Sequence, residues 1–160
     1  HSTLSEVLEA DLLVHVLDVS HSEVRRHFDV TLAVLKEMGA EDIPMLIAFN
    51  KVDQIKELSQ LHLTKVWVAN VVRKSQISPI FMSAFKKTDI QNLRQAVLSF
   101  FERRMETYDV LIPFDDGKTA AKIFEIGKVD SKLITEKGTF YRVRTLPQFA
   151  EQICLRRYKV

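Results

Sequence analysis

The stretch MLIAFNKVD, residues 45–53, decides the fold predicted for this chain. Its apolar run is five residues long, follows a proline and ends abruptly at Asn50, Lys51 and Asp53. This length and these boundaries favour a fully buried parallel strand over a helix. In open α/β sheets, ligands bind outside the carboxyl ends of the strands. The sequence therefore brings an amide, an ammonium and a carboxylate to the sheet edge where a ligand is expected.

The functional groups of this stretch suit a guanine base. A fixed Asp53 carboxylate could accept two adjacent N–H groups, which guanine presents at N1 and its exocyclic amine, whereas adenine has no donor at N1. Sites built on such polar pairing reject the wrong ligand by roughly 10⁴–10⁵. Asn50 could bond another edge of the ring or connect neighbouring loops, and the stem of Lys51 could lie against the base while its ammonium stays in water. The alternative is an ordinary turn in which Asp53 caps the next helix.

A second short apolar run, SPIFMSA at residues 78–84, ends in the small residues Ser83 and Ala84. One long helical pattern separates the two runs, so strand, helix and strand follow each other. With no bulky side chain in the way, the backbone N–H of Ala84 could approach guanine O6. The predicted base-binding residues are Asn50, Lys51, Val52, Asp53, Ser83, Ala84 and Phe85.

Several segments of the chain resemble a known family. NKVD at 50–53 followed by Ser83-Ala84 resembles the fourth and fifth motifs of the translation-factor class of P-loop GTPases. The segment STLSEVLEADLLVHVLDVSH, residues 2–21, looks like the one following switch II in HflX-type ribosome-associated GTPases, and LIPFDDGK, residues 111–118, looks like the start of their small C-terminal domain. The resemblance covers essentially the whole chain, and its opening segment is the most specific part. Phe85 departs from it, because many relatives have lysine at that position.

The resemblance implies an α/β fold, the second half of a parallel-sheet P-loop GTPase domain followed by a small α+β domain. We expect residues 1–106 to form the GTPase part, without phosphate loop or switches, and residues 107–160 to form a β-α-β-β-α module. In the first part we expect strands at 12–17, 45–49 and 78–83 and helices at 22–38, capped by Ser22, at 55–73, and at 90–104, capped by Asp89. In the second we expect strands at 108–114, 128–135 and 140–146, a hairpin turn at Lys137-Gly138, and helices at 117–126 and 147–157.

The parts that hold phosphate and magnesium are not visible in the sequence. Gly117-Lys118-Thr119 looks like the end of a phosphate-binding loop, but Ile112 stands where that loop needs its first glycine. No Asp-x-x-Gly occurs, since the residues three before the four glycines are Lys36, Phe114, Phe124 and Thr135. We therefore expect no catalytic residue and no metal ligand here, and only very weak nucleotide binding. In the resembled family the GTP/GDP phosphates and Mg²⁺ are held upstream, so the parent protein would be the GTPase.

Composition sets further bounds. The chain has 160 residues and a net charge of +2, which is no nucleic-acid signature by itself, and its single cysteine, Cys154, excludes an internal disulfide. No apolar run approaches the roughly 20 residues of a membrane span, and no signal-peptide pattern is present, so we expect a cytoplasmic protein. The start at His1, within a helical pattern, suggests a piece of something longer. His15, inside an apolar run, is either a ligand or base, or a hydrogen-bonded core histidine.

Three functions remain open at this point. By resemblance, the parent protein binds the large ribosomal subunit and uses GTP to rescue or split stalled ribosomes. A second interpretation is a nucleotide-free docking module derived from half a GTPase domain, and a third is an unrelated α/β enzyme in which the 50–53 motif is a coincidence. In the family's sheet the strand at 12–17 neighbours the first strand of the domain. Without that neighbour, we expect an apolar edge through which the chain could dimerise.

Overall fold

A computed structural model describes residues 3–55, 66–69 and 77–160 of the chain. It divides into two compact units, His1–Val97 and Leu98–Val160, and the division falls within helix α4, Lys87–Glu102. No helix in the described part of the chain combines the length and the hydropathy that a bilayer crossing requires.

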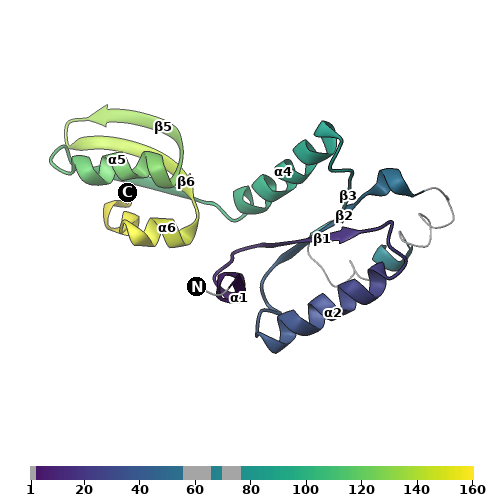
Figure 1. Ribbon diagram of the computed structural model, residues 1–160. Coiled ribbons are helices and arrows are strands. Elements are labelled where there is room, and N and C mark those ends of the chain that lie inside the picture. The colour runs from purple at the N-terminus through teal and green to yellow at the C-terminus, as the bar shows by residue number, and fades with distance from the viewer. Residues whose placement is uncertain (1–2, 56–65, 70–76) are drawn as a thin grey trace. The chain divides into compact units, whose positions relative to one another are not determined.

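The first unit contains a parallel sheet of three strands in the order β1-β2-β3 (Figure 1). Strand β1 pairs with β2 from Leu13↔Met45 to Asp18↔Asn50, and β2 pairs with β3 at Ala48↔Ile80 and Phe49↔Phe81. The third strand is shorter than expected because only two of its residues enter the ladder. The elements are α1 (Thr3–Leu8), β1 (Leu13–Asp18), α2 (Val24–Glu37), β2 (Met45–Asn50), the 3₁₀ turn η1 (Val52–Gln54), β3 (Ile80–Phe81) and α4.

Helix α2 packs its first turns on one face of this sheet. Val24 and Phe28 are buried there with Leu17, Ile47 and Phe49, as alternation along the strands requires. Leu32, which the periodicity also places on the apolar face, is exposed. The helix expected at 55–73 lies mostly outside the described residues, and its described part, 66–69, is helical. Trp67 in this part packs edge-on against Phe28 and Phe49.

The ends of α2 are only partly as predicted. Ser22 does not cap the helix: Glu23 is the N-cap residue, and no side chain caps that position. The Glu23 N–H instead donates to Nδ1 of His21 at 3.1 Å. At the other end Gly39 follows the helix with φ 72° and donates its N–H to the Lys36 carbonyl, as a terminating glycine does.

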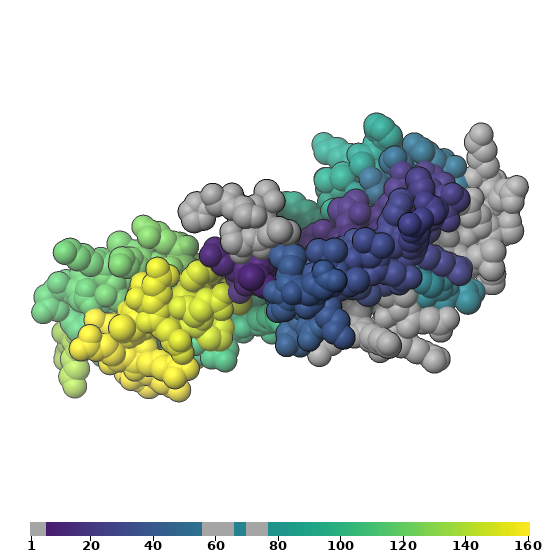
Figure 2. All heavy atoms as spheres, turned by 60° about the horizontal axis from the view of Figure 1, so that its bottom comes forward, coloured from purple at the N-terminus to yellow at the C-terminus, as the bar shows by residue number. Residues whose placement is uncertain are grey.

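The second unit is an antiparallel sheet of order β4-β6-β5 with two short helices. The core of this unit contains Tyr108, Val110 and Ile112, which alternate along β4, together with Tyr141, Val143 and residues of the helices. Figure 2 shows the atoms of the last segment, in yellow, packed against the green atoms of the same unit. The elements are β4 (Glu106–Ile112), α5 (Gly117–Ile126), β5 (Gly127–Thr135), β6 (Gly138–Thr145), α6 (Pro147–Gln152) and the 3₁₀ turn η2 (Leu155–Tyr158).

Two details of this unit differ from the prediction. The hairpin closes at the pair Thr135↔Gly138, so its turn residues are Glu136 and Lys137. Gly138 has φ 151°, and a Cβ there would overlap the Ile112 carbonyl, which is why glycine is needed one position later than expected. The terminal helix is also interrupted, because Cys154 adopts a left-handed conformation with φ 55° between α6 and η2.

Candidate functional site

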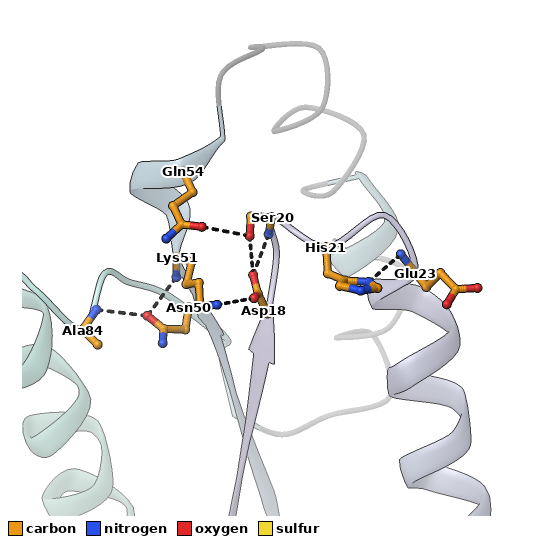
Figure 3. A network of polar contacts seen from close by, with 8 residues as sticks. All are labelled: Asp18, Ser20, His21, Glu23, Asn50, Lys51, Gln54 and Ala84. Atoms are coloured by element: carbon orange, nitrogen blue, oxygen red, sulfur yellow. Dashed lines mark hydrogen bonds and ion pairs between the residues drawn. The ribbon is translucent and has the colours of Figure 1, made fainter.

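The carboxyl ends of the three parallel strands lie side by side (Figure 3). Beyond the β1–β2 ladder, the Val19 N–H donates to the Asn50 carbonyl at 3.0 Å. Beyond the β2–β3 ladder, Met82 N–H donates to the Phe49 carbonyl at 2.8 Å, and Val52 N–H donates to the Met82 carbonyl at 3.3 Å. The loops that follow β2 and β3 are therefore joined by backbone hydrogen bonds.

The Asn50 side chain connects these two loops. Its Oδ1 accepts the backbone N–H of Lys51 at 2.8 Å and that of Ala84 at 3.0 Å. Of the two roles considered for Asn50, the connection of neighbouring loops is the one observed. We expected the Ala84 N–H to approach guanine O6, whereas in the structure it donates to the side-chain amide oxygen of Asn50. The Nδ2 group of Asn50 is the donor half of the same amide.

Lys51 has an unusual backbone and a paired head group. Its φ is 67°, in the left-handed region, which costs a non-glycine residue roughly 1–2 kcal/mol. Its Nζ lies 2.6 Å from Oδ2 of Asp18, and its side chain is 43% exposed. We expected this ammonium to stay in water, whereas the structure joins it to the end of β1. Conformations of this kind in a non-glycine residue often mark functional sites.

Asp18 is the residue of this site to which sequence reasoning assigned no role. Its Oδ1 accepts the backbone N–H of Ser20 at 3.0 Å and the Ser20 hydroxyl at 2.6 Å. The bond from Lys51, followed by the bond from the Ser20 hydroxyl, lowers the pKa of the Asp18 carboxyl from 3.8 to about 2. The available signal was its position: it ends a buried strand next to the strand that ends at Asn50.

Asp53 and Val52 occupy η1, directly after Lys51. Asp53 is exposed and is not the cap residue of this turn, a position that Lys51 holds without a side-chain hydrogen bond. Capping of the following segment lies outside the described residues. Val52 packs partly against the core of the sheet, which anchors the turn and leaves the carboxylate of its neighbour at the surface.

The turn after β3 is held by Asp89. Ser83 is buried, its N–H donates to Oδ2 of Asp89 at 2.9 Å, and its Oγ accepts the N–H of Phe85 at 3.3 Å. Asp89 therefore does not precede the helix as a cap: α4 begins at Lys87, and the carboxylate of its first turn reaches back to the loop. The Phe85 side chain is 87% exposed beside Ala84.

His15 lies in the middle of strand β1 rather than at its carboxyl end. It is opposite Ile47 in the ladder and stacks on Phe28, with ring centroids 5.7 Å apart. Its buried Nδ1 has no hydrogen-bond partner in the described structure, so the expected hydrogen-bonded histidine is not confirmed at that atom. Burial lowers the pKa of the imidazole, which is consistent with a neutral packing residue.

The other candidate features of the sequence have structural explanations. Gly117-Lys118-Thr119 begins α5, where Asp116 caps the helix by accepting the Thr119 N–H at 3.2 Å. Within the ranges that the structure describes, no group of three or more histidine, cysteine or acidic side chains could hold a metal ion. The groups assembled at the strand ends are the amide of Asn50, the ammonium of Lys51 and the carboxylate of Asp18.

Comparison with known proteins gives consistent names. No protein-family model matches the chain. Sixteen curated proteins match it significantly. The GTPase HflX of Gluconacetobacter diazotrophicus is 32% identical over 146 residues, 91% of this chain and 30% of that protein. The GTPase HflX of Akkermansia muciniphila is 34% identical over 138 residues, 86% of this chain and 31% of that protein. The GTPase HflX of Escherichia coli is 23% identical over 140 residues, 86% of this chain and 31% of that protein.

These matches run through both units of the structure, since each covers most of the chain. They rule out the interpretation as an unrelated α/β enzyme with a coincidental motif. The chain spans about 30% of the length of the curated relatives it matches, and over that length it is similar to proteins named GTPase HflX.

Proposed function

We propose that this chain supplies the base-recognition part of a guanine nucleotide site in a longer GTPase. The proposal is supported by the two hydrogen bonds that Asn50 Oδ1 accepts from the N–H groups of Lys51 and Ala84, which join the loop after β2 to the loop after β3. The exposed carboxylate of Asp53 follows directly. In this proposal Asp53 accepts the two N–H groups of the guanine edge, and the Nδ2 of Asn50 donates to another edge.

The remaining predicted residues complete the pocket in the same proposal. The stem of Lys51 supports the face of the base. Ser83 and Ala84 keep the approach to the ring open because their side chains are small, and Val52 anchors η1. Exposed Phe85 stands where many relatives have lysine, and its ring offers a flat apolar surface to the base in place of a lysine stem.

The wider assignments follow from the family. We propose that the parent protein hydrolyses GTP and uses GTP/GDP with Mg²⁺, because phosphoryl transfer depends on a phosphate loop, magnesium and a positioned water. No step is assigned to a metal in this chain, and we expect the chain alone to be inactive. The parent would act on the large ribosomal subunit, in ribosome splitting or rescue, in the cytoplasm.

The proposed architecture is the second half of a P-loop GTPase domain followed by an α+β module. We place the boundary between residues 106 and 107, after the first residue of β4. Support comes from pairing: β4 forms its whole ladder with β6, from Glu106↔Thr145 to Ile112↔Thr139. This sheet is built from a different part of the chain than the parallel one.

Titration of residues 1–160 with nucleoside monophosphates, followed by amide chemical shifts, tests the site. GMP should shift the amides of residues 50–53 and 83–85 with weak affinity, and AMP should not. In the parent protein Asp53→Asn should replace the preference for GTP by one for XTP, because the amide presents a donor where xanthine carries an oxygen. Equal shifts with both nucleotides, or an unchanged preference for GTP, would refute the proposal.

The nucleotide-free docking module remains a second candidate because of a groove on the C-terminal unit. Its volume is about 660 Å³. Leu111, Phe140 and Leu133 lie in one cross-strand row over the three strands and form part of its wall. The docking interpretation would be favoured if residues 1–160 do not respond to GMP but bind a protein partner through this groove. The groove is lined by Leu111, Leu133, Thr135, Glu136, Lys137, Phe140 and Val160.

A further inference from the structure

The carboxylate of Asp18 connects the end of β1 directly to Lys51 and, through Ser20, to η1. Oδ2 pairs with the Lys51 ammonium at 2.6 Å. Oδ1 accepts both donors of Ser20, and the Ser20 hydroxyl also lies 3.3 Å from Oε1 of Gln54, the last residue of η1. Figure 3 shows Asp18 between these groups, with Gln54 above it and Lys51 at its side. One carboxylate therefore links three segments of the site.

These contacts fix the Lys51 side chain at both of its ends. The left-handed backbone, held by the bond from its N–H to Asn50 Oδ1, sets where the side chain leaves β2. The ion pair with Asp18 sets where the side chain ends. A lysine stem is a flexible chain of four methylenes that readily covers apolar surface. With both ends held, it becomes an ordered apolar strip between the ends of β2 and β1.

We propose that Asp18 is a positioning residue for nucleotide binding, which holds Lys51 so that this strip supports the face of the base. The inference rests on the proposed guanine site and adds a residue outside its two motifs. A base's face is similar in guanine and hypoxanthine, whereas its hydrogen-bonding edge is not. Asp18 therefore sets affinity without regard to the exocyclic amine, and Asp53 reads that amine.

A double-mutant cycle on residues 1–160 tests this role. GMP and IMP are titrated into the wild type, Asp18→Asn, Lys51→Met and the double variant, with amide chemical shifts as the readout. Methionine keeps an unbranched apolar stem but has no ammonium, so it removes the ion pair alone. Asp18→Asn should weaken GMP and IMP by the same factor, about fivefold, the size expected for a partly exposed ion pair. In the Lys51→Met background it should cause no further loss, because Asp18 acts through Lys51.

A spectroscopic signal separates positioning from general stability. In the wild type, without nucleotide, the ordered Lys51 ammonium should give a resolved ¹⁵N–H signal that Asp18→Asn abolishes while the rest of the amide spectrum stays folded. If Asp18→Asn does not fold, Lys51→Met alone decides, since it leaves the bonds between Asp18 and Ser20 in place.

The possible failures are distinguishable. Undiminished binding by Asp18→Asn or Lys51→Met overturns this inference and leaves the guanine site standing. A further loss on adding Asp18→Asn to Lys51→Met, or a loss for GMP but not for IMP, also overturns it, because Asp18 would then act by another route. If the wild type does not respond to GMP, the proposed function fails and this inference fails with it.

Discussion

Asn50→Ala is the substitution that probes the strand-end site most directly. It removes the oxygen that accepts the N–H groups of Lys51 and Ala84. The first of these bonds is part-buried and the second is exposed. A hydrogen bond of this kind contributes about 0.5–1.5 kcal/mol, so the part-buried bond belongs near the top of that range and the exposed one near the bottom. The expected loss in free energy of unfolding is about 2 kcal/mol.

Urea denaturation of residues 1–160 measures this loss. With a slope of about 1–3 kcal/mol per molar for a small protein, the midpoint should fall by about 1 M. Asn50→Asp is the matched control: it keeps an acceptor oxygen for both N–H groups, loses the Nδ2 donor and adds a negative charge. It should retain most of the stability. Amide hydrogen exchange should accelerate at Ala84 in the alanine variant and stay slow in the aspartate variant.

The two variants also separate structure from recognition. Since Asn50→Asp keeps the loops connected but cannot donate to the base, it should be stable and still bind GMP more weakly. The reasoning is refuted if Asn50→Ala lowers stability by less than about 0.5 kcal/mol with unchanged exchange at Ala84, because the amide would then contribute no connection between the loops.

Three further predictions concern other parts of the chain. The pKa of Asp18 is lowered to about 2 from 3.8, so its carboxylate stabilises the fold above pH 4, and this contribution is lost as the pH falls from 4 to 2. Discounted because the Asp18 side chain is one-third exposed, the contribution to the free energy of unfolding is about 1 kcal/mol. The difference in urea midpoint between wild type and Asp18→Asn should therefore vanish near pH 2. Gly138→Ala should lower the melting temperature of the C-terminal unit, because the new Cβ meets the Ile112 carbonyl, whereas Gly117→Ala, with open space at its Cβ, should not. Residues 1–160 should dimerise at high concentration through β1, which is an edge strand in the described sheet and whose Val16 is 55% exposed. Val16→Lys should weaken the dimer. A monomer in equilibrium sedimentation at every concentration would contradict this prediction.

Local patterns were sufficient for much of the fold. The apolar runs at 12–17 and 45–49 became β1 and β2, and the helical spacing from Val24 onward became α2. The strands expected at 128–135 and 140–146 became the hairpin of β5 and β6. Burial of a run or of one face is written into residue order, because the periods of 2 and 3.6 are properties of the backbone itself. Some element boundaries differ from the prediction because long-range contacts decide them. For example, Asp89 lies inside the first turn of α4 and accepts the N–H of Ser83, so it does not cap the helix.

The sequence by itself determined that polar residues follow two buried strands and that their groups suit a guanine edge. Only the tertiary structure decided how those groups are used: Asn50 bonds Ala84, 34 positions away, and Lys51 pairs with Asp18 across the β1–β2 ladder. These contacts depend on strand order and register, which bring together residues far apart in the chain. Periodicity and propensity describe only near neighbours, so which oxygen meets which N–H is settled when the strands pair.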